Sequence, residues 1–211
     1  MKMNVYIVNG SGAYVSMFAE KFHVVDDIKH ASLVCFTGGS DVTPALYNQP
    51  RNPHTYCNDG RDLQEIGIFN YCQANGLPMV GICRGGQFLN VMCGGSMYQH
   101  VTGHAQGNHM VKAVGIDIPF IVSSTHHQMM LPHKDAHVLA YADGLSGVRT
   151  HWDGKLFVGH THPNKDAEVV YYAHKDVLCF QPHPEFGGVP ECRDYFFKCV
   201  TDLMEVRYGA E

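Results

Sequence analysis

The chain has 211 residues, with 15 Lys+Arg against 20 Asp+Glu and a formal net charge of −5. This acidic balance, without a run of basic residues, argues against nucleic-acid and membrane-surface partners. The apolar stretches are too short to cross a bilayer. Length, 45% hydrophobic residues and 17% charged residues predict one globular domain over residues 1–211.

The first residues and the cysteines indicate in which cellular compartment we expect the protein. MKMNVYIVNG at residues 1–10 carries one Lys and an apolar run too short for a secretory signal, so we expect a cytoplasmic location. No two of the eight cysteines have the CxxC spacing of a zinc ribbon or a thioredoxin-type motif. Thiols stay reduced in the cytosol, so we expect most of them to be small buried apolar residues.

In the first half of the chain, short apolar runs alternate with helical patterns. The turn residues Asn9-Gly10-Ser11-Gly12 end the first run, and Asn75-Gly76 with Pro78 ends the first helix. Strands are expected at 5–8, 22–25, 33–36 and 79–82, and helices at 61–75 and 85–92. Such β-α-β units predict an α/β fold, with three layers and a mostly parallel central sheet that has helices on both faces.

The second half is less regular. Asp143-Gly144 and Asp153-Gly154 mark turns, the latter in a possible hairpin. Strands are expected at 120–123, 137–141, 155–158, 169–173 and 177–180, followed by a closing helix over 190–206. No repeat or linker interrupts the pattern, which supports a single domain.

The strongest local feature is Gly81-Ile82-Cys83-Arg84-Gly85-Gly86-Gln87, between an expected strand and an expected helix. The G-x-C-x-G pattern is that of a nucleophile elbow, where small neighbours permit a sharp strand-to-helix turn. The helix N-terminus would favour the thiolate of Cys83. The alternative is a buried cysteine in an ordinary glycine-rich turn.

A second motif, Gln181-Pro182-His183-Pro184-Glu185, directly follows the last expected strand. Strand ends of an open parallel sheet meet at one edge, so His183 can approach Cys83 although 100 residues separate them. His183 and Glu185 are two residues apart, a spacing that suits a base and the carboxylate that orients it. In isolation, the same residues could form a surface turn with a solvated histidine.

The chain also has 15 histidines, which raises the question of a metal site. Zinc sites need three or four converging ligands, usually with an i, i+4 pair or a CxxC hairpin. His100, His104, His109, His126, His127, His160 and His162 do not supply that spacing. We therefore expect no metal ion and ordinary hydrogen-bonded histidines. No Walker A or dinucleotide motif is present, so no cofactor is expected.

Taken together, the motifs resemble the class I glutamine amidotransferase superfamily, with the nearest likeness to its γ-glutamyl-γ-aminobutyrate hydrolase and γ-glutamyl hydrolase branch. Four segments carry the resemblance: TGGSDVTPALY at 37–47, DGRD at 59–62, GICRGGQFLN at 81–90 with GGS at 94–96, and QPHPE at 181–185. A weaker likeness at STHHQ, 124–128, matches a segment that lines the family's substrate pocket. The resemblance covers about residues 5–200 and implies the flavodoxin-like fold of that superfamily.

The resemblance implies a catalytic triad of Cys83, His183 and Glu185. It also implies an oxyanion hole made by the backbone N–H groups of Gly39 and Arg84, and substrate contacts by Gln87 and His127. Arg61 and Asp62 would fix a loop. Two departures concern the leaving-group side of the pocket: Pro182 replaces a bulky residue of the hydrolases, and 143–175 matches no pattern of the family.

Three functions follow from these motifs. The first is a stand-alone hydrolase that cleaves a γ-glutamyl amide of a small molecule, glutamine or a γ-glutamyl amine or peptide, through a γ-glutamyl thioester. The second is a glutaminase subunit that delivers ammonia to a separate synthase or ligase. The third, a catalytically idle binding protein, is disfavoured by the intact Cys, His and Glu. The oligomeric state is not predicted.

Overall fold

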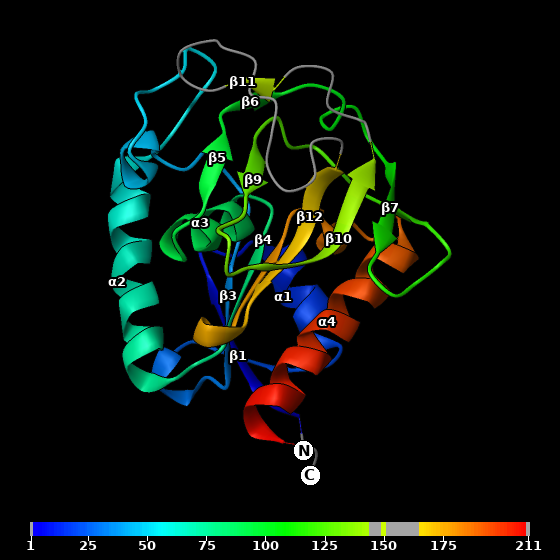
Figure 1. Cartoon of the computed structure of the whole chain (residues 1–211). Coiled ribbons are helices and arrows are strands. Elements are labelled where there is room, and N and C mark those ends of the chain that lie inside the picture. Colours follow the sequence, from blue (N-terminus) through cyan, green and yellow to red (C-terminus); the bar gives the residue numbers. More distant parts are fainter. Residues whose placement is uncertain (1, 144–148, 151–164, 210–211) are drawn as a thin grey trace.

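The computed structural model describes residues 2–143, 149–150 and 165–209. Its main sheet has nine strands in the order β2-β1-β3-β4-β13-β12-β10-β7-β8 (Figure 1). Their bounds are β1 Asn4–Val8, β2 His23–Val25, β3 Leu33–Phe36, β4 Met79–Ile82, β7 His109–Ala113, β8 Phe120–Val122, β10 His137–Asp143, β12 Lys165–Tyr172 and β13 Val177–Phe180.

The sheet has a parallel half and an antiparallel half. Strands β2, β1, β3, β4 and β13 are parallel to one another. From β13 outward, each neighbouring pair through β12, β10, β7 and β8 is antiparallel. The α/β class is confirmed, but the expected mostly parallel sheet is mixed. Among the described residues, no α-helix lies between β5 and β13 to connect parallel strands.

Two small sheets and four helices complete the described structure. The small sheets pair β5 Ser96–Tyr98 with β9 Met129–Leu131, and β6 His100–Val101 with β11 Arg149–Thr150. The helices are α1 Gly12–Ala19, α2 Asp59–Asn75, α3 Arg84–Met92 and α4 Pro190–Tyr208, with 3-10 turns at Ile28–His30, Pro44–Tyr47, Ala173–Lys175 and Pro184–Phe186. Among the described residues, no helix combines the length and the apolarity that crossing a membrane requires.

Local sequence explains the helix ends. The Asn58 side chain caps α2 by accepting a hydrogen bond from the Arg61 N–H, and Gly76 ends it in the left-handed conformation. The short α1 follows the Asn9–Gly12 turn and was not predicted. The strand expected at 155–158 and the hairpin at Asp153-Gly154 lie outside the described residues.

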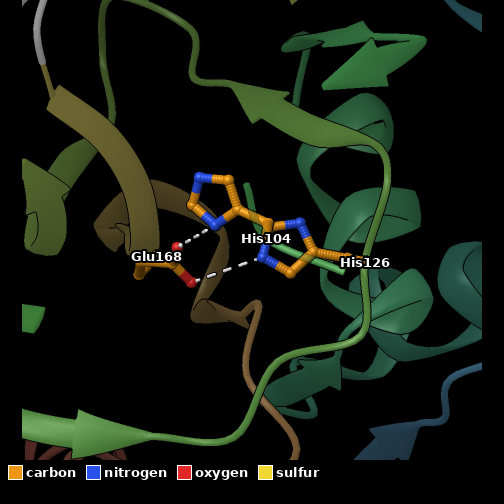
Figure 2. Close-up of side chains that lie close together, drawn as sticks. All are labelled: His104, His126 and Glu168. Atoms are coloured by element: carbon orange, nitrogen blue, oxygen red, sulfur yellow. Dashed lines mark ion pairs between the residues drawn. The ribbon is translucent and has the colours of Figure 1, made fainter. Parts of the chain in front are cut away.

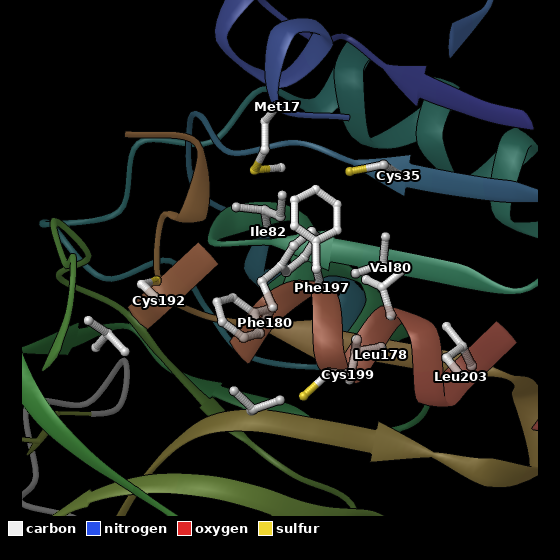
Figure 3. Close-up of a cluster of buried hydrophobic side chains, with 14 of the residues drawn as sticks. Met17, Cys35, Val80, Ile82, Leu178, Phe180, Cys192, Phe197, Cys199 and Leu203 are labelled. Carbon is white, nitrogen blue, oxygen red and sulfur yellow. The ribbon is translucent and has the colours of Figure 1, made fainter. Parts of the chain in front are cut away.

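Helices cover both faces of the sheet, as the three-layer prediction requires (Figure 1). On one face, α1 and α4 pack on the strands through Met17, Phe197 and their neighbours (Figure 3). On the other face, α2 and α3 contribute Phe69 and Phe88 to a second core. Burial of these apolar faces, at roughly 25 cal/mol per Å², is the main stabilising contribution.

The cysteines have no disulfides and separate into three groups. Six lie in the two cores: Cys35, Cys72, Cys93, Cys179, Cys192 and Cys199. Cys57 is only half-buried and forms an isolated β-bridge with Asp41, so it departs from the expected pattern of core cysteines. Cys83 alone stands at a strand-to-helix junction.

Candidate active site

Cys83 occupies a strained turn between β4 and α3. Its backbone has φ 51° and ψ −113°, a conformation that a residue with a side chain rarely adopts. The turn is tight because Gly85 lies against the backbone of Phe36 on β3, where a Cβ would collide with the carbonyl. Strain held by surrounding structure and a sulfur at a helix N-terminus are the properties of a nucleophile elbow.

His183 comes to this elbow because its strand is the neighbour of β4. Phe180 of β13 pairs in parallel with Ile82 of β4, and the Cys83 N–H donates to the Phe180 carbonyl over 2.8 Å. Both strands therefore end at the same edge of the sheet. The Nδ1 atom of His183 lies 2.7 Å from Oε1 of Glu185, which leaves Nε2 for the nucleophile side.

Two further contacts fix the His183 ring. The Oγ1 atom of Thr125 lies 2.9 Å from Nε2. The Phe186 ring stacks on the imidazole with centroids 4.3 Å apart and an interplanar angle of 4°. The backbone of His183 is held as well, because its carbonyl accepts a 2.6 Å hydrogen bond from the Ser123 hydroxyl.

The charges around His183 favour an imidazolium. Burial by itself would lower its pKa, but hydrogen bonds with Cys83 and Glu185, and the negative charges of both, raise the pKa to about 10. An imidazolium next to Cys83 stabilises the thiolate, which is the nucleophilic form of the side chain. The site thus favours a proton on His183 beside a sulfur atom that can attack an electrophilic carbon.

A glycine loop faces the elbow from β3. Gly39 has φ 142°, in the region that favours glycine, and a Cβ there would collide with the Arg61 guanidinium. Arg61 holds the loop by donating to the carbonyls of Gly38 and Thr37 over 2.9 and 2.8 Å. The Gly38 N–H already donates to the Tyr14 hydroxyl over 3.1 Å. Gly39 is therefore the loop position to consider for an oxyanion contact.

Beneath the elbow lies a buried charge network. The Arg84 guanidinium pairs with the carboxylates of Asp62 and Glu65, all almost fully buried. Glu65 also accepts from Arg61 Nε over 2.7 Å. Burial is the largest cause that lowers the pKa of Arg84, to about 10, so Arg84 remains charged at neutral pH. The network joins the first turn of α3 to α2 and to the glycine loop.

A cavity of about 250 Å³ opens in front of Cys83 and His183. The sequence-predicted residues line it, namely Gly39, Cys83, Arg84, Gln87, His127 and His183, with Glu185 behind His183. The Gln87 amide donates to the Gln128 carbonyl and to the Gln181 side chain, each over 3.2 Å. The structure thus brings the predicted site residues to one place.

Three other residues of the site were not predicted. Asp41 lines the cavity and lies 3.2 Å from Nε2 of His127, and this hydrogen bond is the main cause that raises the pKa of His127. Thr125 lines the cavity next to His183. Tyr14 contacts the glycine loop, and burial together with the charge of Glu185 raises its pKa, so its hydroxyl stays protonated. Asp41 and Thr125 lie in the family-like segments 37–47 and 124–128, whereas Tyr14 lies in none of these segments.

Comparison with known proteins decides the family. The model of the family Peptidase C26 matches residues 4–142, about two thirds of the chain. The chain belongs to the Peptidase C26 family. This matched range contains the glycine loop and the elbow, but neither His183 nor Glu185.

Individual relatives agree with that membership. A Mycobacterium tuberculosis protein named "Putative glutamine amidotransferase" is 40% identical over 96 residues, which are 42% of this chain and 30% of that protein. The carbamoyl phosphate synthase small chain of Chlorobaculum tepidum is 31% identical over 165 residues, 76% of this chain and 38% of that one. The chain therefore spans only about a third of the length of these two relatives.

Solved structures show the same fold. A glutamine amidotransferase from Thermotoga maritima superposes with a TM-score of 0.60 at 16% identity, and covers 97% of this chain and 85% of its own. This Peptidase C26 member therefore shares the fold of that glutamine amidotransferase.

Proposed function

We propose that the chain is a cysteine-dependent hydrolase that cleaves γ-glutamyl amide bonds through a γ-glutamyl thioester. The observation that carries this proposal is the strained Cys83 beside a histidine whose other nitrogen is held 2.7 Å from Glu185, at the wall of a cavity. A thiol, a base and an orienting carboxylate are the groups that nucleophilic acyl transfer requires.

The reaction follows from these positions. The imidazole of His183 takes the proton from Sγ of Cys83, and the thiolate attacks the γ-carboxamide carbon. The backbone N–H groups of Gly39 and Arg84 donate to the resulting oxyanion. His183 then gives the proton to the departing nitrogen, and the C–N bond breaks to leave the thioester. Water, deprotonated by His183, attacks that carbon, so that glutamate leaves and the thiol re-forms.

The polar lining of the cavity supports a substrate with an amino-acid end. Asp41 supplies a carboxylate for an ammonium group, and the Gln87 side chain supplies amide dipoles. The small volume, about 250 Å³, suits a glutamyl group with a short leaving amine rather than a protein chain. Length of the leaving group is therefore the variable to test.

The test is a panel of glutamine, γ-glutamyl alkylamides of increasing length and a γ-glutamyl dipeptide, with release of glutamate as the readout. Intact-protein mass spectrometry after an acid quench should detect a γ-glutamyl adduct in the wild type and none in Cys83→Ala. Turnover without any partner protein supports the hydrolase. Absence of turnover and of adduct with every amide would overturn it.

A glutaminase subunit is the second candidate, and one observation favours it. The carbamoyl phosphate synthase small chain, named as part of a synthase, aligns over 76% of this chain. A subunit of that kind would use the same thioester but release ammonia to a separate synthase or ligase. Turnover of glutamine alone, weak until a partner is added, would favour this function over the stand-alone hydrolase.

A further inference from the structure

A second group of titratable side chains lies buried behind the catalytic cavity, and the proposed reaction does not use it. His104, Asp166 and Glu168 have no solvent exposure, and His126 is 3% exposed. They come from the loop before β7, from the loop between β8 and β9, and from β12. Figure 2 shows the rings of His104 and His126 facing the carboxylate of Glu168, one toward each oxygen.

Hydrogen bonds fix which nitrogen of each ring carries its proton. Nδ1 of His126 lies 2.7 Å from the carbonyl of Gln128, which can only accept, so this nitrogen is the donor. Nε2 of His104 lies 2.8 Å from Oδ2 of Asp166, again an acceptor. In the neutral rings, the lone pairs are therefore on Nε2 of His126 and Nδ1 of His104.

These two lone pairs point at a carboxylate. Nδ1 of His104 lies 3.1 Å from Oε1 of Glu168, and Nε2 of His126 lies 3.7 Å from Oε2. Among the described residues, neither nitrogen has a hydrogen-bond partner with acceptable geometry, and neither has Oε2 of Glu168. Electron-rich atoms that converge in a buried space call for a positive charge, which a bound cation or a proton on His104 can supply.

We propose that His104, His126 and Glu168, here called the His–Glu site, bind a divalent first-row transition-metal ion such as Zn²⁺. The donor atoms all lie within 4.8 Å of one another. Tetrahedral coordination with bonds of roughly 2.1 Å separates ligand atoms by about 3.4 Å, and the observed separations of 3.1 and 3.7 Å bracket this value. Two imidazoles and a carboxylate suit such ions, whereas Mg²⁺ and Ca²⁺ prefer oxygen ligands.

The surroundings of the His–Glu site are those of a metal site. Asp166 accepts from the outer nitrogen of His104, and the Gln128 carbonyl accepts from that of His126, the arrangement by which outer residues orient metal-ligating histidines. Nε2 of His109 lies 3.0 Å from Oε1 of Glu168 and holds the carboxylate in place. His126 lines the catalytic cavity, which gives the ion a path of entry.

The position of the ion indicates a positioning role rather than a part in the reaction. The segment 123–128 carries His126 and also the two residues that hold His183, namely Ser123 and Thr125. The hydroxyl of Ser124 donates to the carbonyl of His104, which ties the same segment to the other ligand loop. An ion that joins His104 to His126 would fix this segment, and through it the ring of His183.

The test has to separate the His–Glu site from Cys83 and His183, since a thiolate and an imidazole also bind Zn²⁺. The full chain carrying Cys83→Ala is therefore stripped with a chelator and titrated with Zn²⁺, and with Co²⁺ for its visible absorption bands. We expect one equivalent to bind, Co²⁺ bands of nitrogen and oxygen ligands without sulfur, and a rise in thermal stability.

Variants locate the ion. In the Cys83→Ala chain, Glu168→Gln or His126→Asn should weaken binding at least tenfold, and Asp166→Asn, which alters only an outer residue, about tenfold or more. His133→Asn is the matched control, because it removes another histidine, one paired with Asp135 at 3.2 Å, and should leave binding unchanged.

The proposal fails if the Cys83→Ala chain binds no equivalent of Zn²⁺ or Co²⁺, or if Glu168→Gln and His126→Asn bind as tightly as their parent. Circular dichroism checks that each variant folds. Where a variant does not fold, anomalous scattering at the zinc edge from crystals of the Cys83→Ala chain decides: density elsewhere overturns the proposal. These readouts use no substrate, so they stand apart from the test of the hydrolase.

Discussion

Two buried histidine–carboxylate groups are joined to the segment 123–128 and differ in what their nitrogens face. His183 gives one nitrogen to Glu185 and turns the other toward a thiol and an open cavity. In the His–Glu site, both imidazoles turn toward one carboxylate, and their outer nitrogens are held by groups that only accept. The first arrangement suits transfer of a proton between the histidine and the thiol, whereas the second directs the lone pairs of two histidines at one carboxylate.

The difference shows that neither burial nor a nearby carboxylate assigns a role to a histidine. What decides it is where the remaining nitrogen points: toward a group that can lose a proton, or toward other electron pairs. The two groups should therefore respond differently to the loss of the thiol, to pH and to metal.

Replacement of Cys83 by Ala tests the first half of this comparison. The substitution removes the nucleophile, so glutamate release from the best amide should fall by at least about 10⁴-fold. Metal binding at the His–Glu site should be unaffected. Steady-state assays measure the first effect and zinc titration the second. Retention of even a tenth of the activity would mean that Cys83 is not the nucleophile.

Glu185→Gln probes the charge that acts on His183. The amide keeps much of the shape but removes the negative charge, so kcat/KM should fall by about 10³-fold. The pKa of His183, about 10 in the wild type, should drop as the favourable charge is lost. The alkaline limb of the kcat/KM profile should accordingly move to lower pH. Glu191→Gln, on the exposed first turn of α4, is the matched control.

The same pKa shift has a consequence for stability. A histidine whose pKa is raised from about 6.5 in the unfolded chain contributes stability in full below that pH. This contribution disappears as the pH rises through the folded-state value of about 10. The difference in unfolding free energy between the wild type and Glu185→Gln should therefore shrink from pH 6.5 to 10 in urea titrations. A constant difference over that window would contradict the assigned charges.

Glu65→Gln extends the comparison to a charge network without histidine. Glu65 has no exposure and pairs with both Arg84 and Arg61, so the substitution leaves buried cations undercompensated and should cost about 3 kcal/mol. Urea unfolding measures this loss, which should not vary between pH 6 and 9. Asp202→Asn breaks the exposed pair with Lys198 and should cost under about 1 kcal/mol. If both substitutions lowered the free energy of unfolding equally, Glu65 would not be one of the residues that stabilise the elbow.

Local sequence predicted the parts of the fold where one signal dominates. The strands 33–36, 79–82 and 177–180 agree with β3, β4 and β13 to the residue, because each is a fully buried apolar run between turn residues. The helix α1 was missed, since it has only eight residues and begins at the glycine that closes a turn signal. The antiparallel half could not be predicted, because its pairing depends on long-range register.

The site divides in the same way. Cys83, and His183 with Glu185, stand in short motifs, so the sequence alone is enough to propose their roles. The His–Glu site has no local motif: His104 and its partner Asp166 are 62 residues apart, and His109 and Glu168 are 59 apart. Spacing rules for metal ligands detect pairs on one helix or hairpin and do not detect such a set. The expectation of no metal ion rested on those rules alone.

Thr125 directly precedes His126 in the chain, and its hydroxyl lies 2.9 Å from Nε2 of His183. Thr125→Val keeps the branched shape and removes this hydrogen bond, worth about 1 kcal/mol, so kcat/KM should fall about fivefold. Thr125→Ser retains a hydroxyl and serves as the control. Equal losses in both variants would assign the effect to packing, and a loss above about 100-fold would make Thr125 part of proton transfer.

Measuring the Thr125 variants with and without metal tests whether the His–Glu site acts on His183 through Thr125. If an ion at the His–Glu site orders the segment 123–128, its removal should lower the activity of the wild type and of Thr125→Ser. Metal removal should lower the activity of Thr125→Val less, because this variant already lacks the hydroxyl that contacts His183. Interactions that share a path are not additive, whereas independent ones are. Equal fold-changes on metal removal in all three chains would mean that the ion, where bound, acts on the fold and not on the ring of His183.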